Sequence, residues 1–255
     1  DASYNIRIGD FKARISGYYT AFNDQSKVIS YYDDVAATFS NFAMSGINKT
    51  HYGVELAASI PIYEGLALKG ALSWGEYKYS NNPHYVQIQD NSAKVINEGK
   101  VYWKGKKVES TPQTAANIGL SYRSRNNLFL SLDMNYYNNM YLSMSPLYRT
   151  DAVLTKAMLD NPEMLEAIRA QEKFDPAFVM NASVGKNWYI NRTYTLGFSL
   201  SVDNLLNNQG IKTGGYEQIR LLKNKEASTL TYEPFDAKYF YMFGTNYYLN
   251  LYFRF

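Results

Sequence analysis

The chain ends in the stretch Tyr247-Tyr248-Leu249-Asn250-Leu251-Tyr252-Phe253-Arg254-Phe255, which alternates between two kinds of side chain. The odd positions are all apolar or aromatic, whereas the even positions include Asn250 and Arg254. A period of two residues predicts a β-strand with one dry face and one wet face. Such a strand is typical either of a soluble sheet or of a membrane barrel whose outer face contacts lipid. The sequence of the rest of the chain distinguishes these two alternatives.

The composition favours a membrane interface. The 255 residues include 25 Tyr, 13 Phe and 3 Trp, and tyrosine has an apolar ring with a polar tip that suits the boundary between lipid and water. A Tyr-rich soluble β protein is the alternative. No run of 18 apolar residues occurs and the mean hydropathy is −0.38, which excludes a transmembrane helix. The chain has no cysteine, so disulfides and thiolate metal sites are excluded as well.

Alternation of the same kind recurs along the chain and predicts nine antiparallel strands. The predicted strands cover residues 4–8, 11–19, 52–60, 66–74, 118–122, 128–136, 178–184, 196–202 and about 239–255. Several of these segments approach the 9 to 11 residues that a tilted membrane strand needs. Aromatic residues cluster where the strands would cross the two interfaces, as two girdles would require.

The connections alternate in length. Short turns are expected at 9–10, 61–65, 123–127 and 191–192, and long loops at about 23–47, 80–111, 143–177 and 206–238. Long loops are uncommon in compact soluble domains, whereas an outer-membrane barrel has short periplasmic turns and long extracellular loops. We therefore predict an all-β fold, an antiparallel transmembrane β-barrel with these four loops outside the cell. Since nine strands is an odd number, residues 1–255 are expected to be the C-terminal part of a larger barrel.

Two segments resemble a known family. Ser201-Val202-Asp203-Asn204-Leu205-Leu206-Asn207-Asn208 and the terminal strand are similar to the corresponding parts of TonB-dependent outer-membrane receptors. Gly214-Gly215-Tyr216-Glu217-Gln218 resembles a variant found in receptors with a carboxypeptidase-like N-terminal extension. The resemblance implies a 22-stranded barrel in the bacterial outer membrane, closed by an N-terminal plug, that takes up a scarce ligand with energy from an inner-membrane coupling protein.

The resemblance also implies partners and an assembly signal. The partners are outer-membrane lipid, the remaining barrel strands and plug, the inner-membrane coupling protein and, on the long loops, a surface protein. Neither the plug nor the coupling box is in this sequence. The terminal strand resembles the signal that the barrel-assembly machinery recognises, which would be carried by Tyr247, Leu249, Leu251, Phe253 and Phe255.

Catalysis is not expected. His51 and His84 lie in different segments, and no nucleophile motif, phosphate loop or pair of metal-ligating histidines occurs, so we predict no enzyme activity, no metal and no cofactor. The strand faces predicted to be polar carry Glu55, Asp133 and Asp203, where solvated or paired carboxylates are the simpler interpretation. The net charge of +3 is scattered, which argues against a nucleic-acid partner.

The long loops carry the remaining candidates. Asn161-Pro162 predicts the start of a short helix inside the third loop, with Asn161 as N-cap, that either acts as a lid or fills out the loop. Aromatic residues in the loops could stack on a sugar, a siderophore or a peptide, or could pack on each other: Tyr85, Tyr102, Trp103, Tyr148 and Tyr216. The ligand-binding residues are unknown at this level.

Two functions therefore stay open. The first is energy-coupled uptake by a receptor barrel, and the second is a non-transporting outer-membrane barrel that holds partner proteins through its long loops. The residues that precede Asp1 would separate them, because only the first requires a plug.

Overall fold

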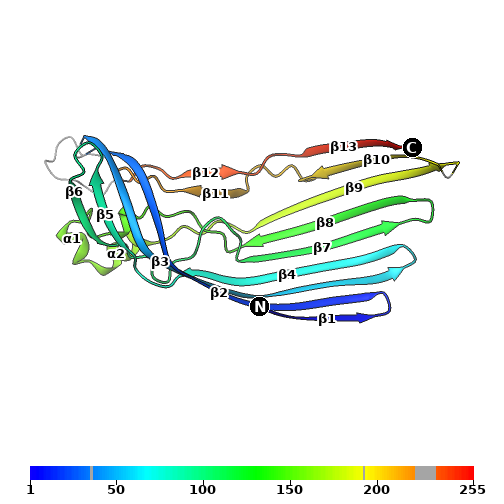
Figure 1. The fold of residues 1–255 in the computed structure, drawn as a ribbon, viewed down its shortest axis with the longest axis horizontal. Helices are drawn as coiled ribbons and strands as arrows, with labels where there is room; N and C mark the ends of the chain where they lie inside the picture. The colour runs from blue at the N-terminus through cyan, green and yellow to red at the C-terminus, as the bar shows by residue number, and fades with distance from the viewer. Residues whose placement is uncertain (35–36, 192, 222–233) are drawn as a thin grey trace.

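The computed structural model describes residues 1–34, 37–191, 193–221 and 234–255, and it is nearly all antiparallel β-structure. One large sheet of eleven strands contains a row of nine in the order β1-β2-β3-β4-β7-β8-β9-β10-β13 (Figure 1), and its other two strands, β5 and β6, are joined to β3 off this row. Their bounds are β1 (Ala2–Ile8), β2 (Phe11–Asp33), β3 (Thr38–Tyr63), β4 (Leu66–Tyr79), β7 (Thr114–Arg123), β8 (Leu128–Asn138), β9 (Ala177–Ile190), β10 (Tyr194–Asp203) and β13 (Asn246–Arg254). The predicted all-β fold is confirmed.

The short connections lie at one end of this sheet, on the right in Figure 1. Each has a residue in the left-handed backbone conformation that tight turns require, namely Gly9, Gly65, Asn127 and Asn191. The predicted turns at 9–10 and 123–127 are confirmed, and the one at 61–65 is shorter than predicted because β3 continues to Tyr63 and leaves only residues 64–65 for the turn. The fourth includes Arg192, which lies outside the described residues.

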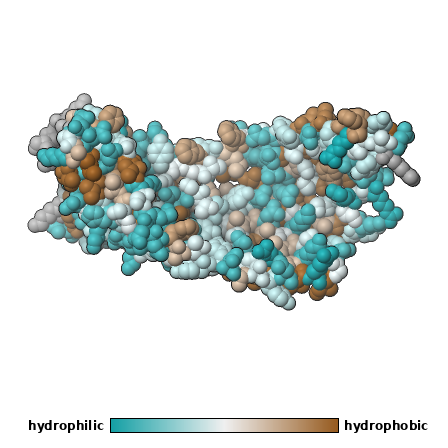
Figure 2. Space-filling model, viewed as in Figure 1, coloured by the Kyte–Doolittle hydropathy of each residue, from teal (hydrophilic) through white to brown (hydrophobic). Residues whose placement is uncertain are grey.

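The register sorts the side chains onto two faces. One cross-strand row runs from β3 to β13 through Ile60, Leu68, Leu120, Leu132, Ala182, Val202 and Tyr247. The adjacent row runs from β1 to β9 through Arg7, Lys12, Ser59, Lys69, Gly119, Asp133 and Asn181. One face of the sheet is therefore apolar and the other polar, as the alternation predicts. Figure 2 shows hydrophilic residues over the middle of the sheet and apolar ones along the edge formed by β10 and β13.

The sheet has two open edges. β1 is paired with β2 and β13 with β10, and in the part of the chain that the structure describes these two strands are not paired with each other. This agrees with the expectation that the nine strands do not close on themselves.

The long connections contain much more regular structure than predicted. Residues 23–47 were expected to form a loop, but β2 and β3 continue through most of this range as a paired hairpin. Segments such as Lys27 to Tyr32 are rich in β-branched and aromatic residues, and β5 (His84–Gln89) and β6 (Val95–Lys100) extend the hairpin into a small sheet. The long connections at 23–47 and 80–111 therefore contain paired strands that the alternation pattern does not predict.

The third connection contains the predicted helix. It holds a 3₁₀ turn (Leu147–Arg149), α1 (Lys156–Leu159) and α2 (Pro162–Arg169), and the side chain of Asn161 accepts a hydrogen bond of 3.1 Å from the N–H of Met164. The predicted N-cap is confirmed. Among the residues that the structure describes, none of the helices has the length and apolarity that crossing a bilayer requires.

The predicted last strand is interrupted. Instead of one strand over residues 239–255, β12 (Lys238–Tyr241) pairs with β11 (Lys212–Tyr216), and β13 begins only at Asn246. The side chain of Asn204 causes part of this break by donating to the carbonyl of Phe243 (2.9 Å), while the backbone carbonyl of Asn204 accepts from the Thr245 hydroxyl (2.9 Å). The Asn-rich segment that carries the family resemblance thus has a structural role where β12 joins β13.

Candidate functional site

The four long connections pack together into one module at the end of the sheet opposite the short turns (Figure 1). We call this module the cap, and its described residues are 23–34, 37–47, 80–111, 143–177, 206–221 and 234–238. All four connections contribute to a hydrophobic core that also includes Tyr79 from the end of β4: Tyr31, Phe42, Met44, Ile47, Tyr85, Val101, Trp103, Met144, Leu147, Tyr148, Val153 and Leu221. Burial of each large apolar side chain contributes about 1.5–3 kcal/mol, so the cap is held as a folded unit.

Several of the aromatic residues in the long connections belong to the hydrophobic core of the cap. Tyr85, Trp103 and Tyr148 are almost fully buried, and the rings of Phe42 and Tyr85 stack with their centroids 4.5 Å apart. These residues therefore hold the cap together and are not free to stack on a ligand. Tyr102 and Tyr216 differ, since Tyr216 is exposed and the hydroxyl of Tyr102 donates to Asp151 (2.7 Å).

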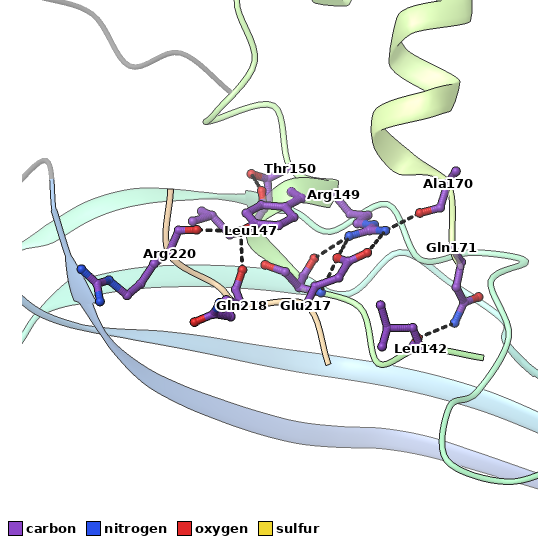
Figure 3. Close-up of polar contacts among 11 residues, drawn as sticks. Leu142, Leu147, Arg149, Thr150, Ala170, Gln171, Glu217, Gln218 and Arg220 are labelled. Atoms are coloured by element: carbon purple, nitrogen blue, oxygen red, sulfur yellow. Dashed lines mark hydrogen bonds and ion pairs between the residues drawn. The ribbon is translucent and has the colours of Figure 1, made fainter. Parts of the chain in front are cut away.

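A buried ion pair joins the third and fourth connections, as Figure 3 shows. The guanidinium of Arg149, whose side chain is 1% exposed, pairs with both carboxylate oxygens of Glu217 and also donates to the carbonyl of Ala170. The second oxygen of Glu217 accepts from the N–H of Ser145 (2.9 Å). A buried charge is tolerated only when it is paired and hydrogen-bonded, so this pair fixes how the two connections meet.

A second set of contacts extends the same junction. The hydroxyl of Tyr148 lies against the carbonyl oxygens of Gln218 and Arg220, and the guanidinium of Arg220 pairs with Asp34 at 2.8 and 2.9 Å. Asp34 belongs to the tip of the β2–β3 hairpin. The fourth connection is thus anchored to both the third connection and the hairpin.

The hollow below the hairpin tip is too small to be a general ligand site. It has a volume of about 140 Å³ and is lined by Asp34, Asn97, Leu147 and other residues. Its buried amide is already satisfied, because Gln87 donates to the Tyr31 hydroxyl (2.7 Å) and to Asp33 (2.8 Å). Ligand pockets usually have about 300–1,000 Å³.

A hollow of about 410 Å³ lies on the sheet and is lined by polar-face residues such as Arg14, Glu55 and Asn135.

The structure places the other predicted residues as follows. His84 is exposed, and His51 lies between the rings of Phe22 and Tyr77, with centroid distances of 5.0 and 4.6 Å. Asp133 shares the polar face with Glu55. The five residues of the predicted assembly signal lie on β13 or at its end, and each is exposed: Tyr247, Leu249, Leu251, Phe253 and Phe255. Their role in assembly stays a prediction.

Sequence reasoning missed the Arg149–Glu217 pair. The two residues are 68 positions apart, in two connections whose contact no periodicity reveals. The sequence signal for Glu217 is its place in the Gly-Gly-Tyr-Glu-Gln segment, which resembles part of a receptor family. Arg149 has no such signal.

The cap is expected to lose stability at alkaline pH. Burial raises the pKa of Tyr31 and of Tyr85 above the ordinary value of 10.0, because the ionised phenolate is disfavoured in the core. The stability from keeping these tyrosines neutral is fully present below about pH 10 and is lost as the pH rises towards their folded-state pKa values. Tyrosinate absorbance in a pH titration should show a late cooperative step that coincides with increased proteolysis of the cap. If all the tyrosines ionised in one early, non-cooperative step, this prediction would fail.

Comparison with known proteins adds little beyond the fold. No family model matches the chain, and no curated protein matches it. Among solved structures, the chain is similar to FpvA of P. aeruginosa in complex with a heterologous pyoverdine and iron, with 13% identity and a TM-score of 0.37. The match covers 99% of this chain but 32% of FpvA, so the chain spans about a third of that protein's length. A likeness this distant leaves the function to be argued from the sheet and the cap.

Proposed function

We propose that this chain is part of a transmembrane β-barrel receptor of the bacterial outer membrane. The observation that carries the proposal is the continuous apolar face along the row of nine strands, on which Ile118 is 59% exposed and Leu251 is 70% exposed. In a soluble domain a second layer would cover such a face, and within the described residues none does. Lipid is the environment in which an uncovered apolar sheet face is stable.

The ends of the strands support an orientation. Exposed aromatic residues near the short turns include Tyr63, Trp188 and Tyr189, and those towards the cap include Tyr19 and Trp74. Two such levels match the aromatic girdles at the two membrane interfaces. Because outer-membrane barrels have short periplasmic turns and long extracellular connections, we place the cap outside the cell and the short turns in the periplasm.

The transport role rests on the cap together with the resemblance to TonB-dependent receptors. A folded cap above one end of a membrane sheet can contact a ligand or a protein outside the cell, whereas the short turns have too few residues to build a binding surface. We propose energy-coupled uptake of a scarce ligand, with the plug, the other strands and the inner-membrane coupling protein as partners.

Deletion of residues 143–177 tests this role. The segment supplies Leu147, Tyr148 and Arg149 to the cap, so its removal should open the cap and abolish ligand or partner binding and uptake, while insertion into the membrane persists. Surface labelling, membrane fractionation and an uptake assay would measure these effects.

The matched control replaces the turn at 124–127 by another turn of the same length, which should leave binding and uptake intact. If the turn replacement abolished uptake and the deletion did not, the extracellular and periplasmic ends would be assigned the wrong way round. The proposal would then be wrong.

A partner-holding barrel without transport is the second candidate. Val28 and Phe39 are each more than 60% exposed on the outer face of the β2–β3 hairpin, where the rings of Tyr32 and Phe39 meet edge to face. A group of exposed apolar and aromatic residues of this kind suits a protein contact. Dissipation of the inner-membrane proton gradient should abolish uptake by a receptor but leave a held partner in place.

A further inference from the structure

Four cations gather on the polar face of the sheet near the short turns. Arg7 on β1 is directly opposite Lys12 on β2, and Ser59 separates Lys12 from Lys69 on β4 in the same cross-strand row. Arg14 is two residues along β2 from Lys12. With strands about 4.8 Å apart and about 3.4 Å per residue, the four backbone positions fall within roughly 10–15 Å of each other. We call Arg7, Lys12, Arg14 and Lys69 the basic patch.

The charges of the basic patch are not balanced by ion pairs with other described residues. The ion pairs that the structure records use other cations, and in the described part of the chain none of these four is in an ion pair. All four residues are exposed, and Arg14 has one recorded hydrogen bond, to the hydroxyl of Ser16 (3.0 Å). Like charges directly opposite each other in a sheet repel, so this arrangement is unfavourable unless an anion lies between them.

The surface around the patch has room for such an anion. Small residues separate the cations on the polar face, with Ala57 and Ser59 on β3 and Ala71 on β4. The patch residues line a hollow of about 540 Å³, which is in the range of small-molecule sites. Asn5, opposite Arg14, adds an amide that can donate to an oxygen of the bound molecule.

We propose that the basic patch is a binding site for a small polyanion with two or more carboxylate or phosphate groups. Arginine binds both groups through paired N–H donors, and lysine adds point charges at the rim. A phospholipid does not fit this site. Its tails contact the apolar face of the sheet, whereas the basic patch lies on the opposite, polar face. The inference rests on the register of β1 to β4 and not on the transport role, so it can fail while that role stands.

Calorimetric titration of the purified protein in non-ionic detergent tests the proposal, with pyrophosphate and citrate as separate probes. We expect saturable binding of at least one probe, and at least tenfold weaker binding after Arg14→Gln combined with Lys69→Gln. The matched control, Lys94→Gln combined with Lys100→Gln, removes two exposed cap charges and should bind like the parent. Chloride added at the same ionic strength should not displace the probe from the site.

Thermal unfolding separates binding from misfolding. The probe should raise the melting temperature of the parent and of the control, but not that of the double variant, which should itself be folded because it has lost repulsive charges. As a further check, Arg14→Lys keeps the charge and should retain most of the binding. Binding by neither probe, equal binding by parent and double variant, or binding only of an acidic peptide would overturn the proposal.

Discussion

Replacement of Leu251 by arginine is expected to lower the free energy of unfolding in a bilayer by about 2–4 kcal/mol. Leu251 is opposite Phe198 on β10, on the apolar face of the sheet. A charge at this position would have to lose its hydration near the middle of the membrane, whereas leucine does not. Urea titration of the protein in lipid vesicles, followed by tryptophan fluorescence, would measure the change, and the amount of protein folded in the outer membrane should fall with it.

Asn250→Arg is the matched control. Asn250 is the neighbour of Leu251 in sequence but is opposite Ser199, on the polar face. Arginine there should cost less than about 1 kcal/mol, because it would face water. If Asn250→Arg were the more destabilising of the two, the assignment of the faces would be reversed.

Glu217→Gln is expected to destabilise the cap by about 3–5 kcal/mol, because it leaves the buried guanidinium of Arg149 without its countercharge. The sheet in the membrane should be unaffected, so the variant should still insert. Trp103 is buried in the cap core and reports its unfolding once Trp74 and Trp188 are replaced by phenylalanine. Denaturant titration of its fluorescence would give the change.

Two controls interpret this result. Arg149→Met combined with Glu217→Leu removes both charges and should recover much of the lost stability. Glu64→Gln breaks the exposed pair with Arg125 at a short turn, where a loss of about 0–1 kcal/mol is expected. A loss from Glu217→Gln no larger than that from Glu64→Gln would show that the buried pair does not hold the cap.

The sheet could be predicted from the sequence because each strand is marked by a pattern within its own residues. Alternation along single strands was sufficient to place Leu120 and Leu132 on one face and Asp133 on the other, and Asn161-Pro162 marked the start of α2. These patterns depend on the geometry of one strand or one helical turn. They do not require knowledge of which segments meet.

The cap could not be predicted in the same way. Arg149 and Glu217 meet only because two distant connections fold against each other, and Trp103 looks like a loop aromatic until the core around it is known. Clean alternation does not extend through residues 23–47, so it does not predict that β2 and β3 continue there, although the β-branched and aromatic residues of this segment favour strands. The interruption before β13 depends on Asn204, which is far from it in sequence.

Contact between lipid and the apolar face of the sheet can be measured residue by residue. Because the chain contains no cysteine, single cysteines at successive positions of β8 can each carry a spin label without background labelling of this chain. We expect frequent collisions with oxygen dissolved in lipid at Leu130, Leu132 and Met134, and with a water-soluble paramagnetic complex at Ser131, Asp133 and Asn135. The absence of this alternation, or its inversion, would show that the apolar face does not contact lipid.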